Sequence, residues 1–362
     1  MYQKGYGIID TLAPLHVGAT AGEESGNLNL IFRDQFTRTG IIPGSSIRGR
    51  FRSEMRLKRQ VWLEKALYKE LNKSLAENKI KIPDSSLREI IEVLDGDKEN
   101  RLSRLNWLEK KAKELNVEPP KEIDENFWYG TSADSELSDS TTEAIVKFEY
   151  ASVLWIPVFC PGQPIVWVSS PKLLKRYQRI AGDFVKVSDK VELKDKNGEK
   201  ILNNAKVPDK YIGSSIVKTL NIEGKKKLFF NFGFLELTKG QTDLSAWFPR
   251  GEELPAVVVA DDEIGMIHDM ALYRQSRVRL KDDEKRVDKG GFFNTEALPE
   301  GTIMVFPVAI RNIVTKSWQP FDNGTESSGI YLGGLESIGF GNCEITLKGI
   351  TPNKTEQQEM KA

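Results

Sequence analysis

The order in which strand-like and helix-like patterns follow one another constrains the fold of this chain more than any other feature. Apolar runs predict strands over residues 6–17, 152–158, 165–168 and 302–310. Apolar residues at helical spacing predict one helix that begins near Ile47 and another that begins at Pro171, behind Ser170. The order strand, helix, strand, strand, helix, strand is that of a ferredoxin-like (RRM-like) α+β core.

Two stretches of different composition interrupt this core. Residues 60–126 are dense in Lys and Glu and poor in β-branched side chains, which predicts a helical insertion followed by a polar loop that ends at 141. Residues 183–255 are irregular and hairpin-like, with a turn signal at 194–198. The predicted division is core at 1–59, 142–182 and 256–350, insertions at 60–141 and 183–255, and a tail at 351–362.

The charge balance disfavours one class of nucleic-acid binder. The chain of 362 residues holds 52 Lys and Arg against 52 Asp and Glu, so its net charge is zero. This disfavours a protein that binds nucleic acid through bulk positive charge, as histones do, but it leaves room for a locally basic groove. Whether the chain can bind nucleic acid therefore depends on where its Lys and Arg residues lie.

Residue types that bind metals are scarce. Cys160 and Cys343 lie far apart and His16 and His268 are the only histidines, which excludes zinc sites built on paired cysteines and His-rich metal sites. We expect no resident metal ion. No apolar run reaches the ~18 residues of a membrane span, and the first residues lack a signal-peptide pattern. We therefore expect a cytoplasmic protein that does not bind membranes.

The segment that follows Pro43 is the strongest candidate for a phosphate contact. Gly44 permits close approach of a ligand to the backbone, a serine can cap the helix, and arginines follow at every fourth position. Alternatively, the segment is an amphipathic helix with a solvated basic face. The candidate RNA-binding residues of this segment are Ser45, Ser46, Arg48, Arg50, Arg52 and Arg56.

A second candidate is a glycine-rich stretch near the C-terminus. Four glycines, Gly333, Gly334, Gly339 and Gly341, fall within nine residues and can form a loop of backbone amides that cradles a phosphate. The stretch precedes a predicted strand and not a helix, which excludes a P-loop and a dinucleotide-binding turn. An ordinary glycine-rich turn is the alternative.

Two further features carry open alternatives. Arg277 and Arg279 alternate along a predicted strand, so they form either a basic RNA-binding face or a solvated edge. His16 stands at a strand end beside the polar loop 18–29, where it is either a general acid or base, a phosphate ligand, or a structural histidine.

Taken together, these segments resemble the RAMP superfamily, the backbone subunits of type III CRISPR effector complexes. The resemblance rests on residues 14–18, 42–49 and 333–341. Residues 154–158 leading to 166–171, and 276–280 leading to Gly290 and to 298–299, are similar to the Cmr-type (type III-B) backbone subunit. The resemblance covers roughly 1–58, 127–180 and 256–350, and leaves out 60–126.

The resemblance implies a function and a set of partners. Such subunits stack along guide (CRISPR) RNA, pair it with target RNA, and assemble with other RAMP subunits and a large polymerase-like subunit. A thumb-like hairpin, here expected within 183–255, wedges between guide and target bases. In active members an Asp in the loop before the helix motif cleaves target RNA, usually with a divalent metal such as Mg or Mn.

The catalytic position departs from this pattern. Aligning residues 31–34 with the family places Leu28 where the Asp belongs, and a leucine can neither bind a metal nor accept a proton. We therefore expect a subunit that binds RNA, without a cofactor, and does not cut. An active metal-dependent endoribonuclease that uses Glu24 or His16, and a non-CRISPR RNA-binding scaffold with the same fold, are the alternatives.

Overall fold

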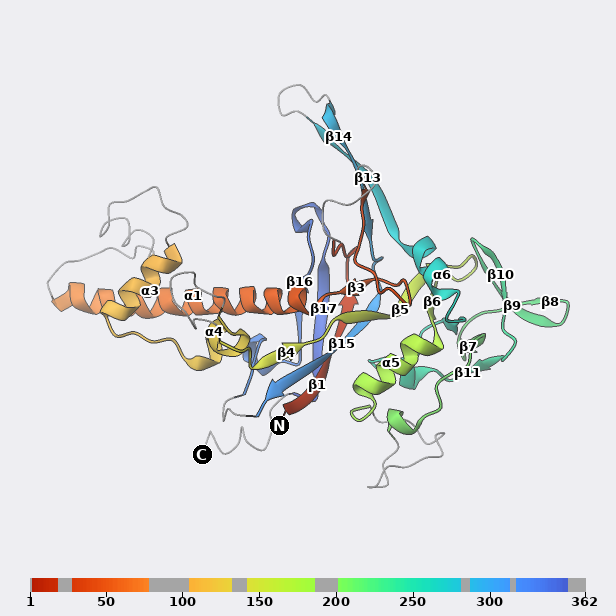
Figure 1. Ribbon diagram of the computed structural model, residues 1–362, viewed down its shortest axis with the longest axis horizontal. Helices are drawn as coiled ribbons and strands as arrows, with labels where there is room; N and C mark the ends of the chain where they lie inside the picture. Colours follow the sequence, from red (N-terminus) through yellow and green to blue (C-terminus); the bar gives the residue numbers. More distant parts are fainter. Residues whose placement is uncertain are drawn as a thin grey trace. The chain divides into compact units, whose positions relative to one another are not determined.

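The computed structural model describes residues 2–18, 28–77, 104–131, 142–185, 201–280, 287–312 and 317–350. The chain forms two compact units (Figure 1). The first contains residues 1–47, 147–313 and 321–362, and the second contains 48–146 and 314–320. The predicted turn at 194–198, the tail 351–362 and Glu24 lie outside the described residues. The mixed α+β class predicted from the sequence is confirmed.

A large sheet forms the body of the first unit. Nine of its strands follow the order β11-β7-β12-β6-β5-β15-β1-β17-β16, and β3 (Ile41–Ile42) pairs with β5. Their bounds are β1 (Tyr2–Thr11), β5 (Ala151–Phe159), β6 (Ile165–Ser169), β7 (Ile212–Ser214), β11 (Gln241–Thr242), β12 (Ala256–Val258), β15 (Ile303–Arg311), β16 (Ser327–Tyr331) and β17 (Asn342–Lys348). The short strand β4 (Val146–Phe148) lies at the boundary between the units.

In the sheet, the first strand of the chain lies between two strands from the C-terminal part. β1 pairs antiparallel with β15 along its length, from Tyr2 opposite Arg311 to Asp10 opposite Ile303, and with β17 on its other side. β15 thus separates β1 from the antiparallel pair β5–β6. The predicted strands are present, although the first runs from Tyr2 to Thr11 and not from residue 6 to 17. The finer ferredoxin-like interpretation of their order stays a prediction.

Burial explains why these segments are strands. Every residue of β5 up to Val158 is buried, which is why its sequence is a continuous apolar run. In β17 buried and half-buried residues alternate, as in a strand with one face on the core.

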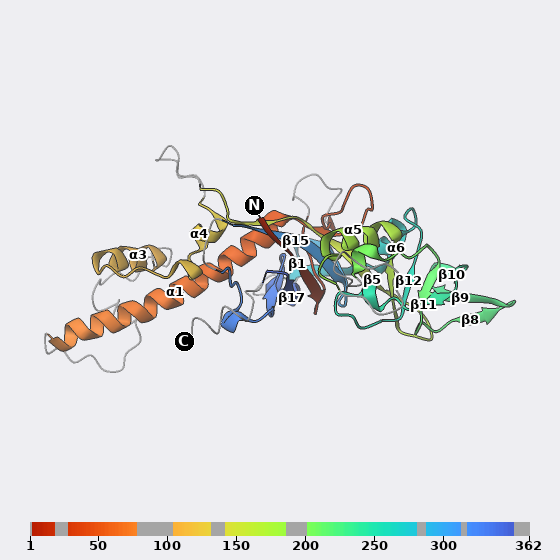
Figure 2. The same cartoon turned by 90° about the horizontal axis from the view of Figure 1, so that it is seen from below.

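Helix α5 (Pro171–Ala181) covers one face of the sheet, against β1, β5 and β15 (Figure 2). Leu174, Tyr177 and Ala181 are its contribution to the core. The predicted start is confirmed: Ser170 is extended at the N-cap and Pro171 occupies the first helical turn. A second helix of this unit, α6 (Ile264–Ala271), also packs on β5.

Two small sheets complete the first unit. Strands β8 (Leu220–Ile222), β9 (Lys225–Phe230) and β10 (Gly233–Glu236) form an antiparallel sheet inside the predicted hairpin-like insertion. Strands β13 (Tyr273–Leu280) and β14 (Val287–Ala297) form a long hairpin, and β2 (Leu28–Asn29) pairs with β14. The sequence indicated one strand at 274–281 but not this hairpin.

The second unit is helical, as the composition predicts. Helix α1 runs without a break from Gly44 to Glu77, so the predicted boundary between residues 59 and 60 falls inside it. The helix begins at Gly44 and not near Ile47, because Pro43 O accepts the amides of Ser46 and Ile47. Helices α3 (Arg104–Glu114) and α4 (Glu125–Tyr129) belong to the same unit.

The core of the second unit is small. Leu63 and Leu67 of α1 pack with Leu108 and Ala112 of α3. The helix predicted from residue 87 to 94 lies outside the described residues. Among the helices that the structure describes, none is long and apolar enough to cross a membrane.

Candidate nucleic-acid interface

The glycine-rich loop and the segment that carries His16 lie together in the first unit. The Gly334 amide donates to the His16 carbonyl at 3.0 Å, and the Gly341 amide donates to the Pro14 carbonyl at 2.9 Å. Gly333 has a φ of +75°, and a Cβ there would lie 2.1 Å from the His16 carbonyl oxygen. The structure thus joins two segments that the sequence indicated separately, and close packing requires glycine at Gly333.

Three amides of the glycine-rich loop donate to protein carbonyl oxygens, and the phosphate-binding role predicted for the loop stays a prediction. The amides of Gly334 and Gly341 donate to carbonyl oxygens of residues 14–16, and the Gly339 amide donates to the Glu336 carbonyl at 3.0 Å. Because these donors are used inside the protein, they are not directed at a ligand. The glycines instead allow the left-handed turns and the close approach to His16.

The His16 side chain is buried and hydrogen-bonded in this arrangement. It is 7% exposed, and its Nδ1 lies 2.6 Å from the carbonyl oxygen of Glu296. A carbonyl oxygen only accepts, so Nδ1 is the donor of this hydrogen bond. The predicted acid–base or phosphate-binding role of His16 stays a prediction.

A charge network around the buried Glu296 lies at the base of the β13–β14 hairpin. Glu296 of β14 binds Arg33 through one carboxylate oxygen and Arg274 through the other. Asp269 binds the same two arginines, at 2.9 and 3.0 Å. Burial alone raises the pKa of Asp269, but these hydrogen bonds outweigh burial and lower that pKa below its usual range. The network fixes the hairpin against the segment that leads into α1.

Arg277 lies against the glycine-rich loop. Its guanidinium is 4.9 Å from the centroid of the Phe340 ring, and the Tyr273 ring packs on Phe340 at 5.9 Å. Arg279 follows in the same strand, where the pairing shifts between Val278 and Leu280; the position of its side chain lies outside the description. The predicted basic strand therefore contributes Arg277 to the surroundings of the loop.

The start of α1 combines two exposed serines with a closely packed glycine. Ser45 and Ser46 are exposed in the first helical turn, where their side chains remain accessible to a ligand. A Cβ on Gly44 would lie 2.4 Å from the Phe148 carbonyl oxygen. The close approach that requires glycine at position 44 is therefore one between two protein segments and not one to a ligand.

The arginines of α1 form hydrogen bonds with helix α4, which the sequence did not lead us to expect. Arg48 donates to the Tyr129 carbonyl, through Nε at 3.0 Å, and Arg52 donates to Asn126 Oδ1 at 2.8 Å. Arg56 and Arg59 both reach the buried carboxylate of Glu125. Within the second unit, the predicted basic stripe thus faces α4. The acidic residues at 122, 124 and 125 are the feature of the sequence that could have predicted this contact.

Arg50 and Arg59 complete this group. Arg50 forms an ion pair with Glu54 one turn later, at 2.6 Å. Arg59 binds both oxygens of Glu125, at 3.0 and 3.1 Å, and also Glu109 of α3 at 2.7 Å. Burial lowers the pKa of Arg52, and the neighbouring Arg56 and Arg48 lower it further. The predicted RNA contacts of Arg48, Arg50, Arg52 and Arg56 stay predictions.

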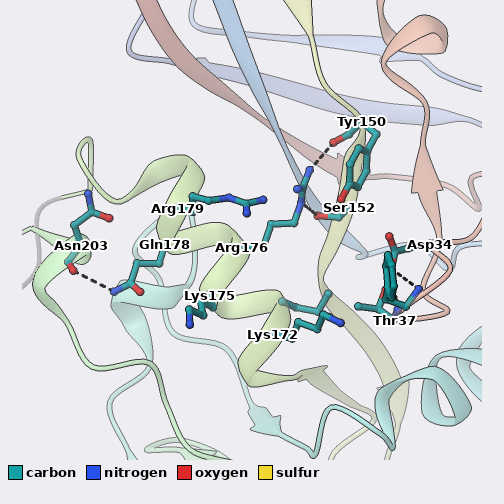
Figure 3. Close-up of a pocket in the computed structure, with 12 residues that line it drawn as sticks. Asp34, Thr37, Tyr150, Ser152, Lys172, Lys175, Arg176, Gln178, Arg179 and Asn203 are labelled. Atoms are coloured by element: carbon teal, nitrogen blue, oxygen red, sulfur yellow. Dashed lines mark hydrogen bonds between the residues drawn. The ribbon is translucent and has the colours of Figure 1, made fainter.

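A basic pocket lies beside helix α5 (Figure 3). The sequence did not lead us to predict it. It has a volume of about 540 Å³ and lies in the first unit. Its cations are Lys172, Lys175, Arg176 and Arg179. Their spacing of three, four and seven residues places them on one side of a helix, a signal that the sequence did contain.

The region of the predicted catalytic loop is only partly described. Leu28 pairs in parallel with Asn294 of β14, so its backbone is part of a sheet. Residues 19–27, which include Glu24, lie outside the described residues. Among the residues that are described, no three His, Cys, Asp or Glu side chains cluster as metal ligands would.

One comparison with known proteins identifies the family. The chain matches the family model of the RAMP superfamily over residues 8–344. No curated protein matches at a significant level. A structure described as "Type III-B Cmr-beta Cryo-EM structure of the Apo state" is 18% identical, with a TM-score of 0.50, and the match covers 95% of this chain and 97% of that chain. Oligomeric Cmr4 from Pyrococcus furiosus, solved by crystallography, is 14% identical, with a TM-score of 0.53 and coverage of 96% and 99%. At these identities the likeness is one of fold.

Proposed function

Since the chain belongs to the RAMP superfamily, we propose that it is a guide-RNA-binding backbone subunit of a type III CRISPR effector complex. The observation that carries the proposal is the extent of the family match, which runs from β1 through the helix opening to the glycine-rich loop. The fold likeness to a type III-B Cmr-beta structure and to Cmr4, over nearly the whole of each chain, supports the same subunit class.

The proposed partners follow from this role. They are guide RNA, target RNA, other RAMP subunits and a large polymerase-like subunit, within a cytoplasmic ribonucleoprotein. The proposed guide contacts are the exposed serines at the start of α1, its arginines, and the loop beside Arg277. We assign the thumb to the β8–β9–β10 sheet and interpret the body of the first unit as an elaborated ferredoxin-like core.

The proposed subunit grips RNA without cutting it. Leu28 offers no oxygen to a metal ion, and its backbone pairs with β14. The alternative, cleavage with Mg or Mn through Glu24 or His16, has a direct test. The assembled complex is incubated with matched target RNA and magnesium. No cut opposite this subunit is expected; a cut that vanishes in Glu24→Ala or His16→Ala would establish the nuclease instead.

The binding role is tested by purification of the chain with its neighbouring subunits. RNA of defined length should co-purify and should resist dilution in moderate salt. Its length distribution is read by denaturing electrophoresis and its sequence by cloning. A complex that assembles and carries no RNA of defined length would contradict the proposal and favour a scaffold outside CRISPR systems.

A further inference from the structure

Helix α5 has two faces with different tasks. Leu174, Tyr177 and Ala181 pack into the core of the first unit, so the helix cannot rotate without losing buried apolar contacts. The cations at 172, 175, 176 and 179 occupy the other side and line the pocket of about 540 Å³. The core therefore fixes the direction in which the basic face points (Figure 3).

Positive charge in this pocket is not neutralised. Asp34 is the only carboxylate that lines it, and its Oδ1 already accepts the amides of Phe36 and Thr37 at 3.0 and 2.8 Å. Neither Lys175 nor Arg179 has an ion-pair partner among the residues that the structure describes. Four cations thus face one carboxylate, which is an arrangement suited to an anion.

Arg176 is fixed in place at the floor of the pocket. Its Nε donates to Ser152 Oγ at 2.8 Å, its Nη2 donates to the Tyr150 carbonyl at 3.1 Å, and its guanidinium lies 4.0 Å from the Tyr150 ring centroid. A guanidinium has five N–H donors, so these two bonds leave others for a ligand. Burial lowers the pKa of Arg176, and the charge of Arg179 lowers it further. The negative charge of a bound anion opposes both effects.

An exposed aromatic ring stands at the rim. Phe36 is 81% exposed, and Lys172 Nζ lies 5.3 Å from the centroid of its ring. The turn that carries it is held by the hydrogen bonds to Asp34, so the ring is presented on a fixed support. Cations beside an exposed aromatic face are the equipment of single-strand nucleic-acid binding, in which phosphates meet the cations and a base stacks on the ring.

We propose that this pocket binds a stretch of single-stranded RNA, with its phosphates on Lys175, Arg176 and Arg179 and an unpaired base on Phe36. It is an RNA contact additional to the start of α1 and the glycine-rich loop. The choice of RNA over another polyanion rests on the proposed function. An acidic protein segment would satisfy the cations but gives no reason for the exposed Phe36.

The test measures binding of the full-length chain to a fluorescent ten-nucleotide oligouridylate over a range of salt concentrations. In Lys175→Ala with Arg179→Ala, binding weakens and the slope of log affinity against log salt becomes shallower by about 1.4, since each single-strand phosphate contact contributes about 0.7. Both side chains are exposed, so the fold should persist, which circular dichroism checks. Lys110→Ala with Lys113→Ala is the matched control: it removes the same charge from exposed positions on α3 and leaves the slope unchanged.

Phe36→Ala tests the stacking step separately. In Phe36→Ala the affinity for the oligonucleotide falls on the order of tenfold, and the salt slope does not change. Phe36→Tyr retains the affinity of the unchanged protein, because its ring can still stack. Phe159→Ala, which removes another exposed ring, serves as the control. Unchanged binding in the lysine–arginine variant overturns the proposal. The proposal is also overturned if polyglutamate competes as well as RNA does and Phe36→Ala leaves the affinity unchanged. The ligand is then an acidic protein.

The outcome is distinguishable from that of the proposed function. Guide RNA can co-purify with the complex while the lysine–arginine variant and Phe36→Ala both bind the oligonucleotide normally. In that case only the assignment of RNA to the pocket fails. If no RNA co-purifies while the pocket variants lose oligonucleotide binding, the guide-binding role fails and the pocket stands. Inorganic phosphate and uridine monophosphate are added as competitors: strong competition by either shows a mononucleotide site and overturns the assignment to an RNA strand.

Discussion

Arg33 Nη2 lies 2.9 Å from Glu296 Oε2, although 263 residues separate them in the sequence. The Glu296 side chain is only 3% exposed, and Arg274 holds its other oxygen. A carboxylate buried to this degree is tolerated because two guanidinium groups and good hydrogen-bond geometry compensate for its desolvation. The pair joins the segment before α1 to the base of the long hairpin.

Glu296→Gln should therefore destabilise the first unit by about 1–3 kcal/mol, because the buried side chain at this position then binds the two arginines more weakly. Urea unfolding followed by tryptophan fluorescence measures the loss. The control is Glu326→Gln, whose partner Lys348 is exposed. An exposed pair contributes about 0–1 kcal/mol. Equal effects of the two substitutions would show that burial of Glu296 is not decisive.

His268 predicts a pH dependence of stability. Burial, and then the charges of Arg33 and Arg274, lower its pKa from 6.5 to about 3, while Asp269 opposes this only in part. Its Nε2 accepts the Gly40 amide at 2.9 Å. Below pH 6.5 the unfolded chain takes up a proton that the folded chain does not. Stability is therefore fully present above pH 6.5 and falls as pH decreases towards 3, by about 1.4 kcal/mol per pH unit within that window.

His268→Gln isolates this contribution, because its amide oxygen can accept the same hydrogen bond but does not titrate. The variant should lose the slope between pH 4.5 and 6, measured as the urea midpoint at each pH. The pKa values of Asp34 and Asp269 are lowered, so these groups titrate below that window. A slope that persists undiminished in the variant would assign the effect to another group.

Alanine substitutions in the glycine-rich loop distinguish the cost of a left-handed backbone from the cost of a steric clash. Gly333→Ala combines a φ of +75° with a clash against the His16 carbonyl and should cost about 2–3 kcal/mol. Gly339→Ala has a φ of +90° but open space, and should cost about 1 kcal/mol. Gly334→Ala is the control, with open space and no left-handed φ, and should stay within about 0.5 kcal/mol. Thermal unfolding of the three variants checks this ranking, which a purely flexible loop would not show.

The arginines of α1 have two separable roles. Arg48→Ala with Arg52→Ala removes the hydrogen bonds to Tyr129 and Asn126, so the second unit should lose about 1–3 kcal/mol of stability. If the same side chains also hold guide phosphates, the salt dependence of RNA binding becomes shallower by up to about 1.4. Lost stability with an unchanged salt slope would move guide RNA away from this helix and leave the arginines a structural role.

Local signals in the sequence were sufficient for some of these features. The start of α5 was predicted from Ser170 and Pro171, and the helical second unit from its composition, because capping, proline geometry and helix propensity act within a few residues. The candidate residues around the glycine-rich loop were also identified. The packing of this loop was not predicted: the amides of Gly334 and Gly341 donate to carbonyls of His16 and Pro14, and no local rule predicts which carbonyl lies opposite.

By itself, then, the sequence determined the mixed α+β class, the position of several core strands and two helices, and the resemblance to one superfamily. The tertiary structure decided that β15 separates β1 from β5, that Glu296 binds Arg33 and that the arginines of α1 meet α4. It also decided that the turn at residues 34–37 meets α5 to form a basic pocket. The physical reason is that periodicity and capping depend on neighbours in the chain, whereas pairing of buried charges and lining of pockets depend on segments brought together only by folding.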